Sequence, residues 1–97
     1  MKPRSLHREA EEEYAEAARH YAAISPALGI RFYQEIEGLI SEVCARPTLY
    51  RRHVGEIRRH FSTVFPYGVL YYDRPEQVRI LAVIPLRRDP AYWRHRV

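Results

Sequence analysis

Two pairs of adjacent arginines are the residues of this sequence best suited to chemistry on an anionic partner. Arg58-Arg59 and Arg87-Arg88 lie in the second half of the chain, where every Lys or Arg position is an arginine. A guanidinium group presents a planar fork of donors that matches phosphate and carboxylate groups. The pairs therefore indicate an anionic partner, although the same charges would also suit a solvated surface that keeps the protein soluble.

The net charge of +4 is distributed unevenly along the chain. Residues 1–46 carry six Lys or Arg and eight Asp or Glu, a balance of −2, whereas residues 47–97 carry ten Arg and four acids, a balance of +6. A basic half of this kind is typical of proteins that bind nucleic acid or acidic protein segments.

Several other kinds of site lack support in the sequence. The five histidines show no metal-ligand spacing and Cys44 is the single cysteine, so we expect no metal and no cofactor. The four glycines form no phosphate-binding loop. A lone cysteine fits a reducing compartment, and no apolar run follows Met1, so we expect a cytoplasmic protein without a membrane partner.

The first half of the chain predicts two helices joined by a short link. Small and aromatic residues recur with helical spacing over residues 9–23, and glutamates crowd the first turns, where the helix dipole favours them. Ser25 and Pro26 suit the N-cap and first position of a second helix, which should end before Pro47. The short link implies that the two helices are antiparallel neighbours.

The second half predicts strands at residues 57–63, 67–72 and 77–84, and Leu6 with its neighbours is a candidate for a fourth. Alternation along the first strand places Arg58 and Arg59 on opposite faces. The last strand is apolar on both faces, which indicates a central strand buried on both faces, or one covered by the hairpin on one face and by the C-terminal tail on the other. We therefore expect a single α+β domain over residues 1–97, with a helical hairpin on a three- to four-stranded antiparallel sheet.

Motifs in a fixed order resemble the RelE/ParE superfamily of type II toxin–antitoxin toxins, and most closely its ParE-like, plasmid-stabilisation branch. The resemblance covers nearly the whole chain and is specific through order and spacing. The motifs are His7-Arg8-Glu9-Ala10, Ser25-Pro26, Arg31-Phe32, Arg46-Pro47, Tyr50, Ile57-Arg58-Arg59, Phe65-Pro66-Tyr67, Tyr71, Ala82-Val83, Arg87-Arg88-Asp89-Pro90 and Tyr92-Trp93. It implies a toxin that a cognate antitoxin neutralises. We expect that antitoxin to contribute an acidic, amphipathic segment that pairs with the basic second half and covers apolar surface left by the hairpin and the sheet.

The resemblance leaves the activity open, because RelE-like members cut mRNA on the ribosome and ParE-like members poison DNA gyrase without hydrolysis. RNA cleavage needs a proton acceptor, cations on the phosphate and an acid for the leaving oxygen. By resemblance the catalytic candidates are Arg58, Arg59, Arg87, Arg88 and Tyr92, with His60 as another proton carrier. Gly68, however, stands where an arginine is expected, and arginine is a poor general base.

Three hypotheses follow: a gyrase-directed toxin without catalysis of its own, a ribosome-dependent mRNA endonuclease, and a non-toxic module that binds the antitoxin. For several single residues, the alternative to a functional role is a structural one. Arg58 or Arg59 could form a salt bridge to the glutamate-rich helices, Cys44 should pack in the core, and Tyr92 and Trp93 should anchor the tail on the sheet. The residues that we expect to bind the target or the antitoxin are Arg58, Arg59, Tyr67, Arg87, Arg88, Trp93 and Arg94.

Overall fold

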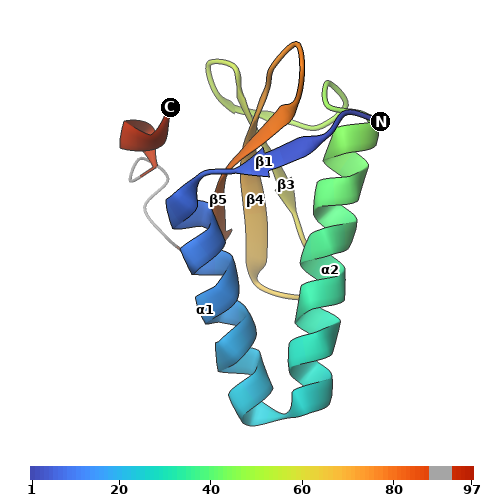
Figure 1. The fold of residues 1–97 in the computed structure, drawn as a ribbon, viewed down its shortest axis with the longest axis vertical. Helices are drawn as coiled ribbons and strands as arrows, with labels where there is room; N and C mark the ends of the chain where they lie inside the picture. Colours follow the sequence, from blue (N-terminus) through green and yellow to red (C-terminus); the bar gives the residue numbers. More distant parts are fainter. Residues whose placement is uncertain (88–92) are drawn as a thin grey trace.

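A helical hairpin forms the N-terminal half of the protein in a computed structural model that describes residues 1–87 and 93–97 (Figure 1). Helix α1 spans Arg8–Ile24 and helix α2 spans Pro26–Ala45. Ser25 alone joins them: its backbone N–H donates to the Tyr21 carbonyl oxygen, and its Oγ accepts from the Leu28 N–H at 3.0 Å. The predicted antiparallel hairpin and its serine cap are thus confirmed.

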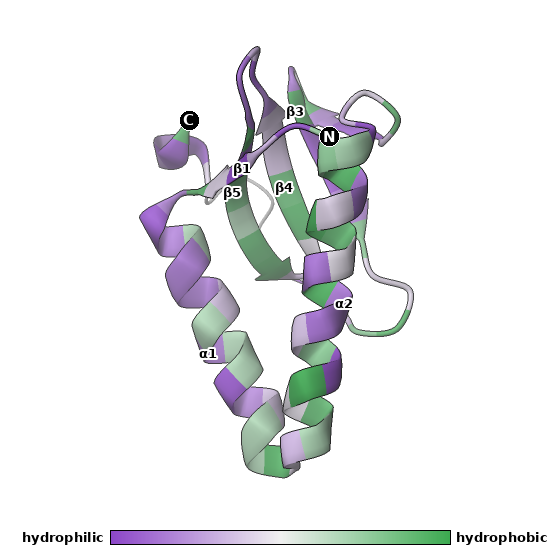
Figure 2. Ribbon diagram, turned by 45° about the vertical axis from the view of Figure 1, so that its right-hand side comes forward, coloured by the Kyte–Doolittle hydropathy of each residue, from purple (hydrophilic) through white to green (hydrophobic). Residues whose placement is uncertain are grey.

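Close contact between the helices near the hairpin tip depends on Gly29. A Cβ atom at this position would lie 2.7 Å from the Cβ atom of Ala22, which is closer than side chains tolerate. Two small residues therefore let α1 and α2 approach at the tip, where Figure 2 shows hydrophobic residues on both helices.

The sheet departs from the prediction in strand number and in direction. In the part of the chain that the structure describes, it has five strands in the order β1-β5-β4-β3-β2, where β1 is Arg4–Leu6, β2 Arg52–Val54, β3 Ile57–Phe61, β4 Tyr67–Asp73 and β5 Val78–Pro85. β1 pairs with β5 in parallel and the other pairs are antiparallel. The expected three- to four-stranded antiparallel sheet is therefore corrected to a mixed, five-stranded one.

Two physical causes explain this correction. β1 lies at the edge of the sheet, runs parallel to β5 and leads directly into α1. Two backbone hydrogen bonds fix this pairing: the Val78 N–H donates to the Pro3 carbonyl oxygen, and the His7 N–H donates to the Ile80 carbonyl oxygen. β2 is short and bears Arg52 and His53, so it lacks the apolar alternation by which strands are recognised.

The sheet buries apolar side chains on both faces. Toward the hairpin, Val69, Tyr71, Val78, Ile80 and Val83 join the core residues of the two helices. On the opposite face, a smaller cluster consists of Ile57, Leu70, Leu81, Ala82, Ile84 and Trp93. An irregularity in the pairing of β4 with β5 lies beside Leu81, and neighbouring Leu81 and Ala82 both belong to this second cluster. The expected cover of the last strand on its two faces is confirmed.

Candidate functional site

The arginine pair of β3 is divided between the two faces of the sheet. Arg58 pairs across the sheet with Tyr71 on the hairpin side, and its Nη1 donates to the Tyr50 carbonyl oxygen at 2.7 Å. The suggested salt bridge to a hairpin glutamate is wrong for Arg58, because a backbone oxygen takes that place. It is His60 that reaches the hairpin, with its Nε2 2.9 Å from Glu42 Oε1 and its ring stacked 3.9 Å from that of Tyr50.

Arg59 lies on the other face of the sheet, next to the Phe61 ring, which fills the space beside Gly68. Its guanidinium carbon is 5.0 Å from the centre of the Phe61 ring, within the range of a cation–π contact. Phe61 pairs with Gly68 across the strands, and a Cβ atom at position 68 would lie 2.3 Å from Phe61 Cδ1. The Phe61 ring therefore occupies the space that a side chain at position 68 would need.

The remaining candidates fall at separate places. Tyr67 packs edge-to-face on Phe32 of α2, with ring centres 5.2 Å apart. Arg87 is exposed in the turn after β5, and Arg94 is exposed in the short C-terminal helix Arg94–Arg96. Trp93 is only 2% exposed and packs in the second cluster. Arg88 and Tyr92 lie outside the described residues.

The described candidates thus do not converge on one point. Arg58 faces the hairpin, Arg59 faces the opposite side, and Arg87 follows the end of β5. Tyr71, the tyrosine nearest to Arg58 in the strand pairing, is fully buried, and its hydroxyl donates to the Pro47 carbonyl oxygen at 2.7 Å. Its burial raises the pKa of Tyr71 to about 12, so this hydroxyl keeps its proton at neutral pH.

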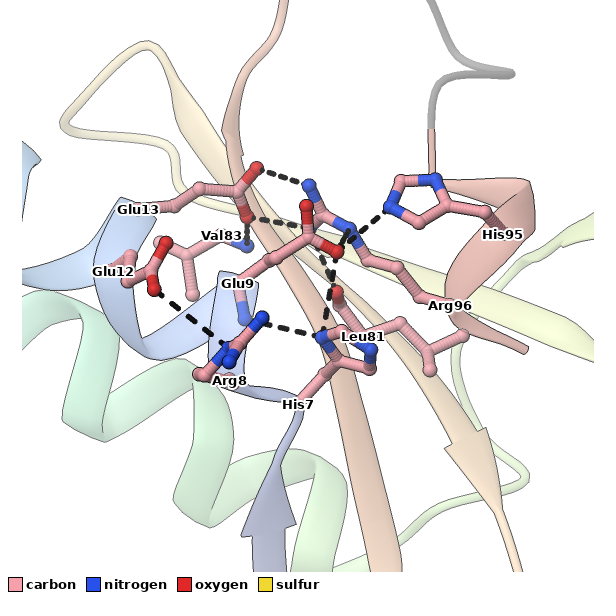
Figure 3. A network of polar contacts seen from close by, with 9 residues as sticks. All are labelled: His7, Arg8, Glu9, Glu12, Glu13, Leu81, Val83, His95 and Arg96. Atoms are coloured by element: carbon pink, nitrogen blue, oxygen red, sulfur yellow. Dashed lines mark hydrogen bonds and ion pairs between the residues drawn. The ribbon is translucent and has the colours of Figure 1, made fainter.

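A polar network that the sequence patterns did not reveal holds the C-terminal helix on α1 (Figure 3). The side chain of Arg96 is 3% exposed; its Nη1 and Nη2 lie 2.8 and 2.9 Å from the two carboxylate oxygens of Glu13, and Nη1 also donates to the Leu81 carbonyl oxygen. Glu13 Oε1 further accepts from the Val83 N–H at 3.1 Å. One carboxylate therefore binds the tail and satisfies a backbone donor of β5.

Glu9, one turn before Glu13, completes this network. Its Oε2 lies 2.7 Å from His95 Nε2 and 3.6 Å from Arg96 Nε. The hydrogen bond from His95 and the nearby positive charges lower the pKa of the Glu9 carboxyl group. The four-residue spacing of Glu9 and Glu13 was the available signal, because it places both carboxylates on one face of the helix.

A shallow apolar groove runs along the surface of the hairpin. Its larger part has a volume of about 420 Å³ and is lined by Ala18, Arg19, Ala22, Pro26, Gly29, Ile30 and Tyr33. A second hollow of about 310 Å³ shares Ala18 and Tyr33 with it and continues to Leu6, Tyr14 and Glu37. Ile30 is 59% and Tyr33 52% exposed, so the groove presents two large side chains with apolar surface to solvent.

The described residues contain no group of three or more His, Cys, Asp or Glu side chains that could hold a metal ion. Within the same part of the chain, no helix is long and apolar enough to cross a membrane.

The fold is similar to that of a solved structure described as the chromosomal ParDE TA system from P. aeruginosa. The match has a TM-score of 0.74, covers 88% of this chain and 96% of that chain, and has 18% sequence identity, so it establishes the fold alone. No curated protein sequence matches the chain significantly. The family model of the ParE toxin of the type II toxin–antitoxin system, parDE, matches residues 5–90. The chain belongs to this family of toxins.

Proposed function

We propose that this toxin inhibits bacterial growth from the cytoplasm by binding DNA gyrase, without cutting nucleic acid itself, and that a cognate antitoxin neutralises it. The observation that carries the proposal is the separation of Arg58 from Arg59. Cleavage of RNA through its 2′-hydroxyl requires a proton acceptor and cations around one phosphate. The two arginines lie on opposite faces of the sheet, and Arg58 is bound to the Tyr50 carbonyl oxygen.

Gly68 and Phe61 support the same proposal. In RelE-like toxins an arginine is expected at the position of Gly68, and here the Phe61 ring fills its space. Arg59, whose guanidinium lies 5.0 Å from the centre of the Phe61 ring, is always protonated and therefore cannot serve as a general base. Binding without hydrolysis is the activity that best fits these residues.

The hairpin groove supports an antitoxin partner. An amphipathic segment buries its apolar side in a groove of this kind, and exposed Ile30 and Tyr33 offer the apolar contacts. Arg19 lines the larger part of the groove and can meet an acidic side chain that flanks the apolar stripe of the segment, whereas Arg4 in the smaller part is already paired with Glu37. We therefore place the antitoxin's acidic, amphipathic segment on this groove.

Inducible expression in a bacterium tests the target. Growth should stop with early induction of the DNA-damage response while protein synthesis continues, and purified toxin should inhibit supercoiling by gyrase. Prompt loss of translation with cleaved mRNA, abolished by Arg87→Ala or Arg88→Ala, would instead establish the mRNA endonuclease. Unaffected growth with soluble, folded protein would leave only a module that binds the antitoxin.

The groove is tested separately with Ile30→Asp in a co-purification and growth-rescue experiment. A buried carboxylate should weaken binding of the antitoxin by at least tenfold, because unpaired charge is costly in an apolar contact. Val64→Asp is the matched control: Val64 is 58% exposed but lies between β3 and β4, away from the groove. Equal binding by the two variants would refute the assignment of the groove, whatever the target of the toxin.

A further inference from the structure

A small basic recess lies on the face of the sheet opposite the hairpin. Its volume is about 190 Å³, and its lining residues are Tyr72, Arg74, Arg79, Leu81, Arg96 and Val97. Tyr72 and Arg79 are directly paired across β4 and β5, so the strand pairing itself holds these two side chains together. Three of the lining side chains are arginines and none is acidic; Val97, the last residue of the sequence, brings one terminal carboxylate to the lining, so positive charge is in excess.

The three arginines differ in the groups that their guanidinium groups contact. Arg96 is engaged by Glu13 through both terminal nitrogens. Arg79 donates through Nη1 to Ser5 Oγ of β1 at 3.1 Å, a neutral partner that orients the guanidinium without cancelling its charge. The guanidinium of Arg74 lies 5.9 Å from the centre of the Tyr72 ring. Among the described residues, neither Arg74 nor Arg79 forms an ion pair with a carboxylate.

Charge and size together restrict the ligand. Two guanidinium groups with uncancelled charge favour an oxyanion, and arginine forks bind phosphate oxygens in pairs. Guanidinium forks match both carboxylate and phosphate oxygens, and a phosphate ion offers more acceptor oxygens to two forks than a carboxylate does. The recess is smaller than the roughly 300–1,000 Å³ of ordinary ligand pockets, so it suits one group and not a whole nucleotide.

We propose that this recess, formed by Arg74 and Arg79 beside Tyr72, binds a single phosphate group, either a free phosphate ion or one phosphate of a nucleic-acid backbone. The site is separate from the hairpin groove and from the arginine pair of β3. The inference does not depend on the identity of the toxin's target, because it rests on the charge, pairing and size of the recess alone.

The test compares Arg74→Gln/Arg79→Gln with Arg31→Gln/Arg51→Gln, a control with the same net charge in which two exposed arginines away from the recess are changed. Inorganic phosphate should shift the Arg79 side-chain NMR signals of the native protein, and the recess variant should bind it at least tenfold more weakly. Binding of a labelled DNA duplex distinguishes the two sources. If a backbone phosphate enters the recess, the recess variant should lower the slope of log K against log salt by about one unit, whereas the control should retain it.

Phosphate binding without an effect on the DNA slope would support the site and assign it to free phosphate. Absence of any phosphate-induced shift at Arg79, or equal weakening by both double variants, would overturn the proposal. So would a phosphate-free acidic peptide that occupies the recess more tightly than phosphate. Circular dichroism of each variant establishes that it is folded before binding is measured.

Discussion

Phe61 and Gly68 show how a single cross-strand pair determines which chemical groups lie on one face of the sheet. The sequence reveals that position 68 lacks a side chain, but it does not reveal what fills the space. In the structure the Phe61 ring lies over Gly68 and beneath the Arg59 guanidinium, so an aromatic and a cation occupy the surface. A glycine covered by a cross-strand aromatic is protected from water and keeps its strand paired.

The contact predicts a strong coupling between these two positions. Gly68→Ala should destabilise the protein by about 1–3 kcal/mol, because the new Cβ overlaps Phe61 Cδ1. In a Phe61→Ala background the same change should cost much less. Urea denaturation of the four proteins in a double-mutant cycle measures the coupling, and additive effects would contradict the contact.

Tyr71 provides a second prediction for single residues. Tyr71→Phe should lower the free energy of unfolding by about 1–2 kcal/mol, because the buried ring would leave the Pro47 carbonyl oxygen without its donor. Tyr72→Phe is the matched control, since its hydroxyl lies 3.3 Å from exposed Glu56 and its loss should cost far less. Thermal unfolding of both variants compares them directly; equal losses would refute the role of the Pro47 contact.

At the scale of elements, the C-terminal helix is held by charge as much as by apolar packing. Trp93 fills the second cluster, while His95 and Arg96 bind Glu9 and Glu13 of α1. This arrangement connects the end of the chain to the start of the hairpin across the edge of β5 (Figure 3). The tail, α1 and β5 should therefore unfold together.

Breaking the buried pair should release the tail. Arg96→Gln should destabilise the protein by about 3 kcal/mol, because it leaves the Glu13 carboxylate without its bidentate partner. Trp93 is the only tryptophan, so its emission should move to longer wavelength as the tail becomes hydrated. Arg94→Gln, at an exposed position of the same helix, should leave the emission unchanged. Unchanged emission in both variants would show that Trp93 alone holds the tail.

The same network predicts an acid-sensitive tail. The folded-state pKa of Glu9 lies below its usual value of 4.5, mainly because of the hydrogen bond from His95. The stability from this carboxylate is therefore fully present above pH 4.5 and is lost as the pH falls through the lower, folded-state value. Trp93 emission between pH 5 and pH 2 should report the loss, and Glu9→Gln should reduce its pH dependence. An identical profile in Glu9→Gln would contradict this role of Glu9.

For the whole molecule, the charge is divided between an acidic first half and a basic second half. The two halves pack together as hairpin and sheet, yet Arg59, Arg74 and Arg79 lie on or beside the far face of the sheet and not against the hairpin glutamates. These arginines are therefore available to an external anionic partner. Folding leaves this positive surface in place because only a few arginines are needed for internal pairs.

The overall net charge of +4 should raise the rate at which an acidic antitoxin segment associates, even though the segment binds on the hairpin side. Because the expected antitoxin segment is acidic, its association rate should fall by about tenfold or more between 50 and 500 mM salt. The dissociation rate should change little, since apolar contact in the groove is insensitive to salt. Stopped-flow fluorescence measures both rates, and a salt-independent association rate would show that long-range charge plays no part.

The sequence by itself determined the two helices, the Ser25 cap, the three main strands and the family, because these depend on local periodicity, caps and the order of motifs. It also placed Arg58 and Arg59 on opposite faces, since alternation in a strand is a local property. Only the tertiary structure decided that β1 joins in parallel, that Phe61 covers Gly68, and that Glu13 binds Arg96. Each of these contacts joins segments separated along the chain. Their partners depend on how the elements pack, which no local pattern specifies.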